Sequence, residues 1–318
     1  MKDERLETIA HSSSFIPHLS SLRGPPMKFG LSLPIVQQIP GRVQAWELTA
    51  GAAELVTVAR AADRLGFSHL SVCDHVAIPQ TRAAAAGTVW YDAAVTLGFL
   101  AAATTRVRLL SHVIVLAYRH PLVVAKSFAT LDQLSNGRVI LGVGSGHLKP
   151  EFRTLGADYE GRASFSDEAI QAIRAAWENE GATFEGRFVQ FRDVTVAPRP
   201  RQRPRPPIWV GGNARSAVRR AVCFADGWIP WMITPAEFGR MVAYAREIAE
   251  RAASFEWVAP LSVGVDDRPA TIIASIEEWL AAGATSFHVG LAHSSLNHLL
   301  ERMSLFAEAT HMGSDASD

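Results

Sequence analysis

Two hydrophobic periods alternate along most of the chain. Short apolar runs, typical of buried strands, are followed by longer stretches in which apolar residues recur three and four positions apart, as on one face of a helix. The predicted strands cover residues 27–33, 70–73, 107–115, 139–143, 208–210, 227–230, 261–265 and 286–289. The predicted helices cover residues 50–65, 93–104, 121–134, 167–178, 216–224, 235–252, 271–281 and 296–309. Eight strands, each followed by a helix, favour a closed (β/α)8 TIM barrel over an open sheet.

One insertion interrupts this alternation, between the fourth helix and the fifth strand. Residues 183–207 begin with three phenylalanines spaced among polar residues and continue into a run rich in proline and arginine, residues 198–207. We expect a short hairpin followed by a connection, and a solvated connection is favoured over an anion site for the basic run. Residues 1–26 are expected to form an N-terminal extension, residues 27–310 the barrel domain and residues 311–318 a tail.

Composition narrows the class of protein. The chain has 318 residues, of which 48% are hydrophobic and 19% charged, as in an ordinary globular protein. Its formal net charge of zero argues against nucleic acid or an anionic membrane surface as a partner. No stretch approaches the ~20 apolar residues of a membrane-spanning helix. Cys73 and Cys223 lie far apart in sequence and indicate neither a disulfide framework nor a metal site, so we expect a cytoplasmic protein without a metal.

The second predicted strand ends in Asp74 and His75, which is unusual for a strand of a parallel sheet. Titratable side chains at the C-terminal end of a barrel strand are typical of catalytic sites. The imidazole of His75 is suited to donate or accept a proton near neutral pH, with Asp74 available to orient it or a ligand. The alternative interpretation makes Asp74 a helix cap and His75 a loop residue.

Two glycine-rich segments follow other strands. Gly144-Ser145-Gly146 and His147 come after the fourth strand, where a backbone without side chains could approach a planar ligand or could simply form a tight turn. Gly211-Gly212-Asn213 comes after the fifth strand and opens a helix, so it could cradle a phosphate or could begin a helix without a ligand.

Other aromatic residues and histidines are interpreted as structural. For Trp90 and Tyr91, packing under a loop is favoured over lining a pocket. The remaining histidines are given the same interpretation, among them His120, His288, His293 and His298.

Together these segments resemble the luciferase-like monooxygenase superfamily of flavin and deazaflavin enzymes, and within it the branch of coenzyme F420-dependent oxidoreductases. The resemblance covers residues 27–310 and rests on the order and spacing of several motifs. They are Lys28-Phe29-Gly30-Leu31, Asp74-His75, residues 128–138, residues 142–151, Trp209-Val210-Gly211-Gly212 and Ala225-Asp226-Gly227-Trp228.

The resemblance implies a tricyclic coenzyme ring in the C-terminal mouth of the barrel, with its phosphate at Gly211-Gly212. It implies that Asp74 contacts the coenzyme, that His75 acts at the hydride-transfer centre, and that a non-prolyl cis peptide backs the ring at His112-Val113. The cofactor-binding residues expected from it are Asp74, Ser111, His112, Val113, Gly144, Ser145, Gly146, Gly211, Gly212, Asn213 and Ser216.

The implied function is hydride transfer between coenzyme F420 and a small organic substrate. Sugar-phosphate dehydrogenases of this group carry a Trp and a Glu where this chain has Pro79 and His147, so reduction of an activated C=C, C=N or C=O is favoured. The proton would come from His75 or His147, and the alternative interpretation makes His147 an ordinary loop residue. The alternatives are a two-component monooxygenase that uses FMN and O2, and a flavin-binding protein without turnover. A homodimer is expected, with a reductase as a possible second partner.

Overall fold

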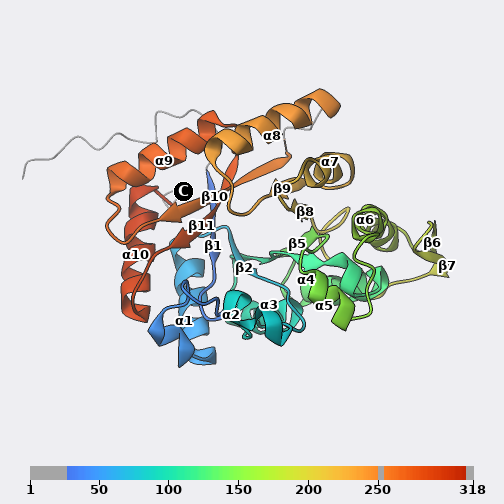
Figure 1. The fold of residues 1–318 in the computed structure, drawn as a ribbon, viewed down its shortest axis with the longest axis horizontal. Coiled ribbons are helices and arrows are strands. Elements are labelled where there is room, and N and C mark those ends of the chain that lie inside the picture. Colours follow the sequence, from blue (N-terminus) through green and yellow to red (C-terminus); the bar gives the residue numbers. More distant parts are fainter. Residues whose placement is uncertain (1–26, 250–253, 313–318) are drawn as a thin grey trace, which may run out of the picture.

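The strands form a closed parallel barrel, seen in the computed structural model, which describes residues 27–249 and 254–312 (Figure 1). The barrel strands are β1 (Lys28–Ser32), β2 (His69–Val72), β3 (Arg108–Ser111), β4 (Ile114–Val115), β5 (Val139–Gly144), β8 (Ile208–Gly211), β9 (Gly227–Ile229), β10 (Glu256–Val263) and β11 (Ser286–Leu291). Pairing runs in the order β3-β2-β1-β11-β10-β9-β8-β5-β4, and an additional β3–β5 pairing closes the ring. Because β4 continues β3, this is the predicted eight-stranded TIM barrel.

Helices surround the barrel on its outer side (Figure 1). The main ones are α1 (Ala52–Leu65), α3 (Ala93–Ala103), α4 (Pro121–Leu134), α6 (Arg162–Glu178), α7 (Arg215–Phe224), α8 (Pro235–Ile248), α9 (Pro269–Ala281) and α10 (Leu296–Ala309). Short elements lie in the loops: α2 (Ala83–Ala86), α5 (Lys149–Thr154), and the 3-10 turns η2 (Ala45–Leu48), η3 (Gln80–Arg82) and η4 (Leu116–Tyr118). The helix predicted to reach residue 252 ends at Ile248, and residues 250–253 lie outside the described part.

Helix starts follow local chemistry. Pro121 occupies the first turn of α4, and the His120 ring accepts the N–H of Leu122. Thr234 and Glu237 form a reciprocal capping box at the start of α8. These signals explain why the beginnings of α4 and α8 agree with the sequence prediction.

Two strands differ from the prediction. The third was expected to be continuous over residues 107–115, but it breaks into β3 and β4 around the peptide bond His112-Val113. That bond is cis, as the resemblance implied. The seventh strand begins at Glu256 and not at residue 261.

The core has two layers. The outer layer joins the strands to the helices, whereas Leu110, Ile140, Trp209, Ile229 and Val258 form a separate buried cluster. Successive residues of a strand face opposite sides, and Ile140 lies between the outer-layer residues of β5, so this second cluster fills the barrel interior. Elsewhere the barrel interior contains polar side chains, which form the floor of the cavity described below.

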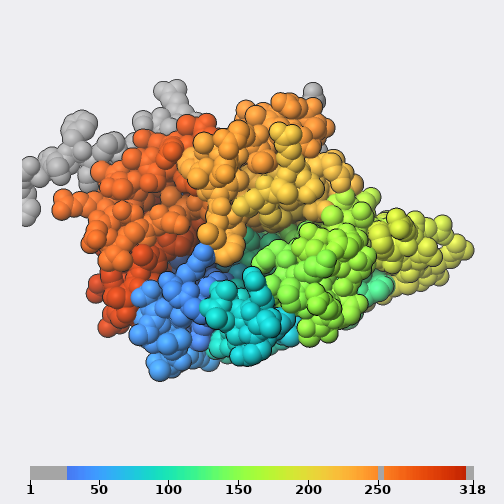
Figure 2. Space-filling model, in the orientation of Figure 1, coloured from blue at the N-terminus to red at the C-terminus, as the bar shows by residue number. Residues whose placement is uncertain are grey.

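The insertion is a hairpin of β6 (Ala182–Glu185) and β7 (Gln190–Val194), as predicted, and it projects from the barrel (Figures 1 and 2). The proline- and arginine-rich run after it is not simply solvated. The Arg205 side chain is 8% exposed and pairs with Glu178 and Asp226. The run is thus a connection with exposed residues such as Arg201, Arg203 and Pro204, as predicted, but Arg205 fastens it to the barrel.

The described helices do not include one that is both long and apolar enough to cross a membrane. The predicted extension, residues 1–26, and residues 313–318 of the predicted tail lie outside the described residues.

Candidate functional site

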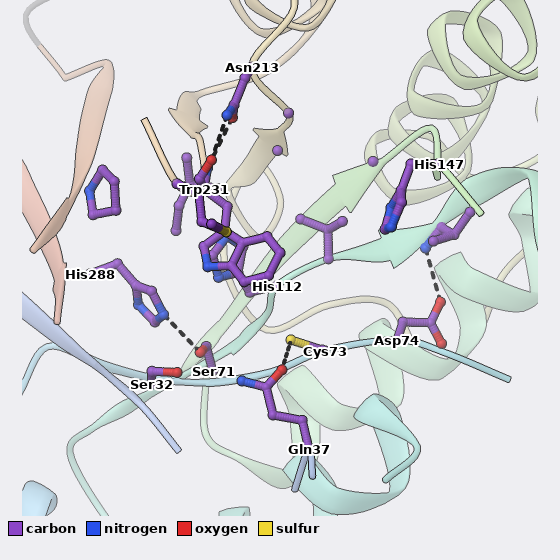
Figure 3. Close-up of a pocket in the computed structure, with 18 of the residues that line it drawn as sticks. Ser32, Gln37, Ser71, Cys73, Asp74, His112, His147, Asn213, Trp231 and His288 are labelled. Atoms are coloured by element: carbon purple, nitrogen blue, oxygen red, sulfur yellow. Dashed lines mark hydrogen bonds between the residues drawn. The ribbon is translucent and has the colours of Figure 1, made fainter. Parts of the chain in front are cut away.

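A cavity of about 860 Å³ opens at the C-terminal ends of the barrel strands (Figure 3). This volume is in the range of pockets that hold a drug-sized ligand or a cofactor. Most of the predicted site residues line it: Asp74, His75, His112, Val113, Gly144, Ser145, Gly146, His147, Gly211, Gly212 and Asn213. Ser111 and Ser216 do not line it. The cavity thus gathers segments that are far apart in the sequence.

Glu151 holds His75 in place. One Glu151 carboxylate oxygen lies 2.7 Å from Nδ1 of His75, and the Glu151 side chain is fully buried. Because a carboxylate only accepts hydrogen bonds, Nδ1 carries a hydrogen and Nε2 is the nitrogen that gains or loses a proton. Among the described residues, none forms a hydrogen bond with Nε2, so this atom is available to a ligand in the cavity.

The Glu151 carboxylate accepts three further hydrogen bonds. They come from the backbone N–H groups of Val76 and Ala77 and from the Tyr118 hydroxyl. Burial acts to raise the pKa of Glu151, but the bonds from His75 and from the backbone outweigh burial and lower it. The same burial, together with Glu151, raises the pKa of Tyr118. Glu151 therefore remains an anion near neutral pH and orients His75.

Asp74 is paired with Arg119. The guanidinium donates to both carboxylate oxygens of Asp74, over 2.6 and 3.0 Å, and the N–H of Val115 donates over 2.9 Å. The Asp74 side chain is 2% exposed. This bidentate pair ties the end of β2 to the turn η4 and so fixes the backbone that presents His75.

Two aromatic side chains lie against His75. The Trp90 ring centroid is 4.4 Å away, and that of His147 is 5.9 Å away. Partial removal from water and the neighbouring His75 lower the pKa of His147. Trp90 lines the cavity, which corrects the favoured packing interpretation, whereas Tyr91 packs against the core. The buried indole N–H of Trp90 has no partner among the described residues.

Histidines and serines form the floor of the cavity. His112 and His288 line it, their ring centroids lie 4.8 Å apart, and Ser71 bonds to His288 (Figure 3). Burial lowers the pKa of His112 to about 4 and that of His288 well below its ordinary value. His288 was interpreted as a structural residue; it is hydrogen-bonded through both ring nitrogens, as such a residue would be, and it also lines the cavity.

Glycines allow the loops to close around Val113. A Cβ at Gly144 or Gly211 would lie 2.6 or 2.7 Å from the Val113 side chain. The Ser111 hydroxyl, by contrast, is buried in the wall, where it donates to the carbonyl of Gly142 and accepts from its N–H. Ser111 therefore joins β3 to β5 behind the cavity surface, although it was predicted to bind the cofactor.

The end of the cavity at α7 suits an anion. Gly212 and Asn213 line the cavity, and Ala214 at the N-cap of α7 offers no side chain to the first N–H groups of the helix. Ser216 is exposed in that first turn. Helix N-termini without a side-chain cap bind phosphates through free N–H groups and the helix dipole. The residues present therefore fit the phosphate of a flavin-type cofactor.

Cys73 lines the cavity without the properties of a nucleophile. Its thiol donates to the side-chain oxygen of Gln37 over 3.0 Å. Burial and the nearby Asp74 raise its pKa to about 12, so the reactive thiolate is not formed at neutral pH. In the described part of the chain, no group of three or more His, Cys, Asp or Glu side chains is arranged to hold a metal ion.

Several site residues were not found by sequence reasoning. Glu151 is the last residue of the motif 142–151 and was assigned no role, yet the preceding Pro150 marks a helix start that could have revealed α5. Arg119, Ser71 and His288 had no local signal, because their partners are distant in sequence. Such pairs require the barrel to be closed before they can be recognised.

Comparisons with known proteins agree with this architecture. The luciferase-like monooxygenase family matches residues 27–315. In the fold comparison, a coenzyme F420-dependent tetrahydromethanopterin reductase from Methanopyrus kandleri gives a TM-score of 0.72 at 18% identity, over 91% of this chain and 100% of that one. At this identity, the likeness shows a shared fold.

Sequence relatives include one enzyme that depends on FMNH2 and one that depends on coenzyme F420. An uncharacterized protein of Mycobacterium bovis is 36% identical over 184 residues, 54% of this chain and 65% of that protein. An FMNH2-dependent dimethylsulfone monooxygenase of Pseudomonas putida is 32% identical over 203 residues, 60% of this chain and 52% of the enzyme. An F420-dependent glucose-6-phosphate dehydrogenase of Microbacterium testaceum is 35% identical over 185 residues, 56% of this chain and 52% of the enzyme. These matches span about half to two thirds of the relatives' lengths. Because the family match covers the whole described barrel, the chain belongs to the luciferase-like monooxygenase family.

Proposed function

We propose that this protein is an oxidoreductase that transfers a hydride between coenzyme F420 and a small organic substrate. The observation that carries the proposal is the His75–Glu151 pair at the cavity. Reduction of a C=C, C=N or C=O bond delivers a hydride to one atom and a proton to the other. A histidine held by a buried carboxylate, with its second nitrogen free, is suited to supply that proton.

The chain's residues have distinct roles in this reaction. The first turn of α7 and the loop Gly211-Gly212-Asn213 would hold the coenzyme phosphate, and Gly144-Ser145-Gly146 would border the ring. When bound, the coenzyme supplies or accepts the hydride. His75 holds or moves the proton at Nε2 while Glu151 keeps Nδ1 protonated. Asp74, paired with Arg119, stabilises the strand end that carries His75.

His147 is the second candidate for proton transfer. Its ring stands beside His75, and it lines the same cavity. No described carboxylate bonds a His147 ring nitrogen, in contrast to His75. His147 therefore serves as a binding group for the substrate in this proposal, together with the unpartnered indole N–H of Trp90.

The coenzyme assignment is tested by direct binding. The purified protein is titrated separately with coenzyme F420 and with FMN, and the change in coenzyme fluorescence is followed. We expect tighter binding of coenzyme F420. Selective binding of FMN would instead support the two-component monooxygenase, which the Pseudomonas putida relative favours, with a reductase as partner. Binding of neither would contradict the phosphate site at α7.

The role of His75 is tested by His75→Ala. We expect unchanged coenzyme affinity and a kcat about 100- to 10,000-fold lower, the usual contribution of general acid–base catalysis. His147→Ala, on the neighbouring ring, should lower kcat much less. If His75→Ala kept full activity and full binding, the proton-transfer role would be wrong, and a flavin-binding role without His75 chemistry would be favoured.

A further inference from the structure

A chain of hydrogen-bonding side chains runs through the interior of the barrel, below the cavity. Ser71 and His288 belong to the cavity floor, whereas His69 lies at the opposite, N-terminal end of β2 and does not line the cavity. Ser68 precedes β2 and is partly exposed at that end. The proposed function above uses none of these groups.

The links of this chain are continuous. Ser71 Oγ lies 3.1 Å from Nε2 of His288, and Nδ1 of His288 lies 3.2 Å from Nε2 of His69. Nδ1 of His69 lies 3.0 Å from Ser68 Oγ. Both ring nitrogens of both histidines are therefore engaged, one toward the cavity and one toward the far end of the barrel.

The neighbouring residues make space for this arrangement. A Cβ at Gly30 would lie 1.9 Å from Nε2 of His69, so the ring occupies the place of a missing side chain on β1. The ring of Trp209 packs edge-on against His69, with centroids 5.3 Å apart. The His69 and His288 rings are nearly parallel, at 8°. The two histidines are thus fixed in the orientation that their hydrogen bonds need.

We propose that Ser71, His288, His69 and Ser68 form a proton relay between the cavity floor and the opposite end of the barrel. The relay deepens the proposed function and rests on it, because it gives the reaction a proton path separate from His75. His75 exchanges protons through the cavity mouth, whereas this path reaches water on the other side of the barrel.

Each passage moves one proton and no electrons. A proton that arrives at Ser71 Oγ lets this hydroxyl release its own proton to Nε2 of His288. Nδ1 of His288 then gives its proton to Nε2 of His69, and Nδ1 of His69 gives its proton to Ser68, which releases one to water. The reverse passage uses the same atoms in the opposite order.

The electrostatic surroundings favour concerted transfer through neutral rings. Burial, followed by His112, Arg108 and Lys28, lowers the pKa of His69 to about 3. Burial, with His112 and His69, also lowers the pKa of His288 well below its ordinary value. A charged imidazolium is therefore disfavoured at either position, so a proton does not rest on the relay between the two ends.

The relay makes a specific prediction about tautomers. Since each ring donates from one nitrogen and accepts at the other, the hydrogen must be on Nε2 in both rings or on Nδ1 in both rings. A passage switches both rings together, so the relay returns to its starting state only when a proton passes in the opposite direction. This alternation suits a site in which uptake and release of a proton occur in separate steps of one cycle.

The first test needs neither coenzyme nor substrate. Ring nitrogen chemical shifts of the ¹⁵N-histidine-labelled protein report the tautomers of His69 and His288. We expect the same tautomer in both rings, and we expect Ser68→Ala to change the tautomer populations of His288 as well as those of His69. Opposite tautomers in the two rings, or a response confined to His69, would overturn the relay, even if the proposed function is correct.

The second test follows hydrogen exchange of the His288 ring N–H while coenzyme F420 covers the cavity. We expect exchange to be at least ~10-fold slower in His69→Phe, which keeps the ring but removes its nitrogens, because exchange must then await local opening. Ser286→Ala is the matched control, since this buried hydroxyl of the first β11 residue has no partner among the described residues and does not line the cavity. Equal exchange in His69→Phe and in the wild type would overturn the relay.

These outcomes separate the two proposals. If coenzyme F420 does not bind, the proposed function fails, and the tautomer measurement still decides the relay. If His69→Phe does not fold, Ser68→Ala replaces it in the exchange test, because Ser68 is only partly buried and lies outside β2. Exchange of the His288 N–H that is unchanged in Ser68→Ala would then count against the relay.

Discussion

At the scale of single residues, buried charge in the site is always matched. Asp74 faces Arg119, and Glu151 faces one histidine, one hydroxyl and two backbone N–H groups. Charges removed from water are costly unless they are paired and hydrogen-bonded. The matching therefore explains how a strand end in the interior of the protein can carry Asp74 and His75.

Arg119→Met tests this matching for Asp74. The change leaves a carboxylate that is 2% exposed without its partner, and we expect the free energy of unfolding to fall by about 3 to 5 kcal/mol. Urea denaturation at neutral pH measures the change. Arg192→Met is the control, because Arg192 pairs with Glu185 where the two side chains are 79% and 65% exposed, and it should cost less than ~1 kcal/mol. Equal losses in the two variants would contradict the structural role of the Asp74 pair.

Sequence reasoning found the residues whose type is unusual for their place. Asp74 and His75 stand out at the end of an apolar strand, and both line the cavity. Glu151 and His288 do not stand out, because a glutamate in a short helix or a histidine in a strand is unremarkable until its neighbours are known. A hydrogen bond between residues 76 positions apart is a property of the closed barrel.

At the scale of elements, the hydrophobic period predicted where helices and strands occur better than where they begin. α4 and α10 agree with their predicted bounds at both ends, because a proline starts α4 and Ser295 caps α10. The early start of β10 at Glu256 and the break between β3 and β4 carried no such signal. Both depend on pairing with strands that are distant in sequence.

Gly30 links an element to the interior of the barrel. We expect Gly30→Ala to lower the free energy of unfolding by about 1 to 3 kcal/mol, because its Cβ would overlap the His69 ring and force it to move. Gly98→Ala is a matched control in α3, where a Cβ would meet nothing within 4 Å. That variant should be neutral or more stable by up to ~1 kcal/mol. Thermal and urea unfolding of both variants decide the point, and a stable Gly30→Ala protein would show that the interior can rearrange.

At the scale of the whole molecule, the fold was predictable because the strand and helix periods repeat eight times. The insertion was predictable for the same reason, as an interruption of that repeat. The polar interior of the barrel was not predictable, because an interior filled with aliphatic residues would show the same hydrophobic periods along the chain. The structure instead surrounds the polar groups with one apolar cluster inside the barrel and another outside it.

The buried histidines make stability depend on pH. His69 and His112 have pKa values of about 3 and about 4 in the folded protein, whereas an unfolded histidine titrates near ~6.5. As the pH falls below ~6.5, the unfolded chain binds protons that the folded protein does not, so the free energy of unfolding decreases. Above about pH 6.5, these histidines do not make the free energy of unfolding depend on pH.

Urea denaturation between pH 7 and pH 5 measures this effect. Each such histidine should contribute a slope of up to ~1.4 kcal/mol per pH unit. The groups facing His69 that act on its charge are His112, Arg108 and Lys28, and Lys28 pairs with Glu256. His69→Phe should therefore show a shallower loss of stability than the wild type over this interval. Identical slopes would mean that His69 titrates with the same pKa in the folded protein as in the unfolded chain.

The N-terminus of α7 has a consequence for the stability of the folded protein. With Ala214 at its N-cap, α7 lacks the stabilisation, typically ~1 kcal/mol, that a serine or aspartate would give at this position. A ligand phosphate bound there would accept hydrogen bonds from the free N–H groups and so supply the missing stabilisation. Bound ligand would add its binding free energy to the stability of the folded protein, so resistance to proteolysis should rise with the concentration of a phosphate-bearing ligand.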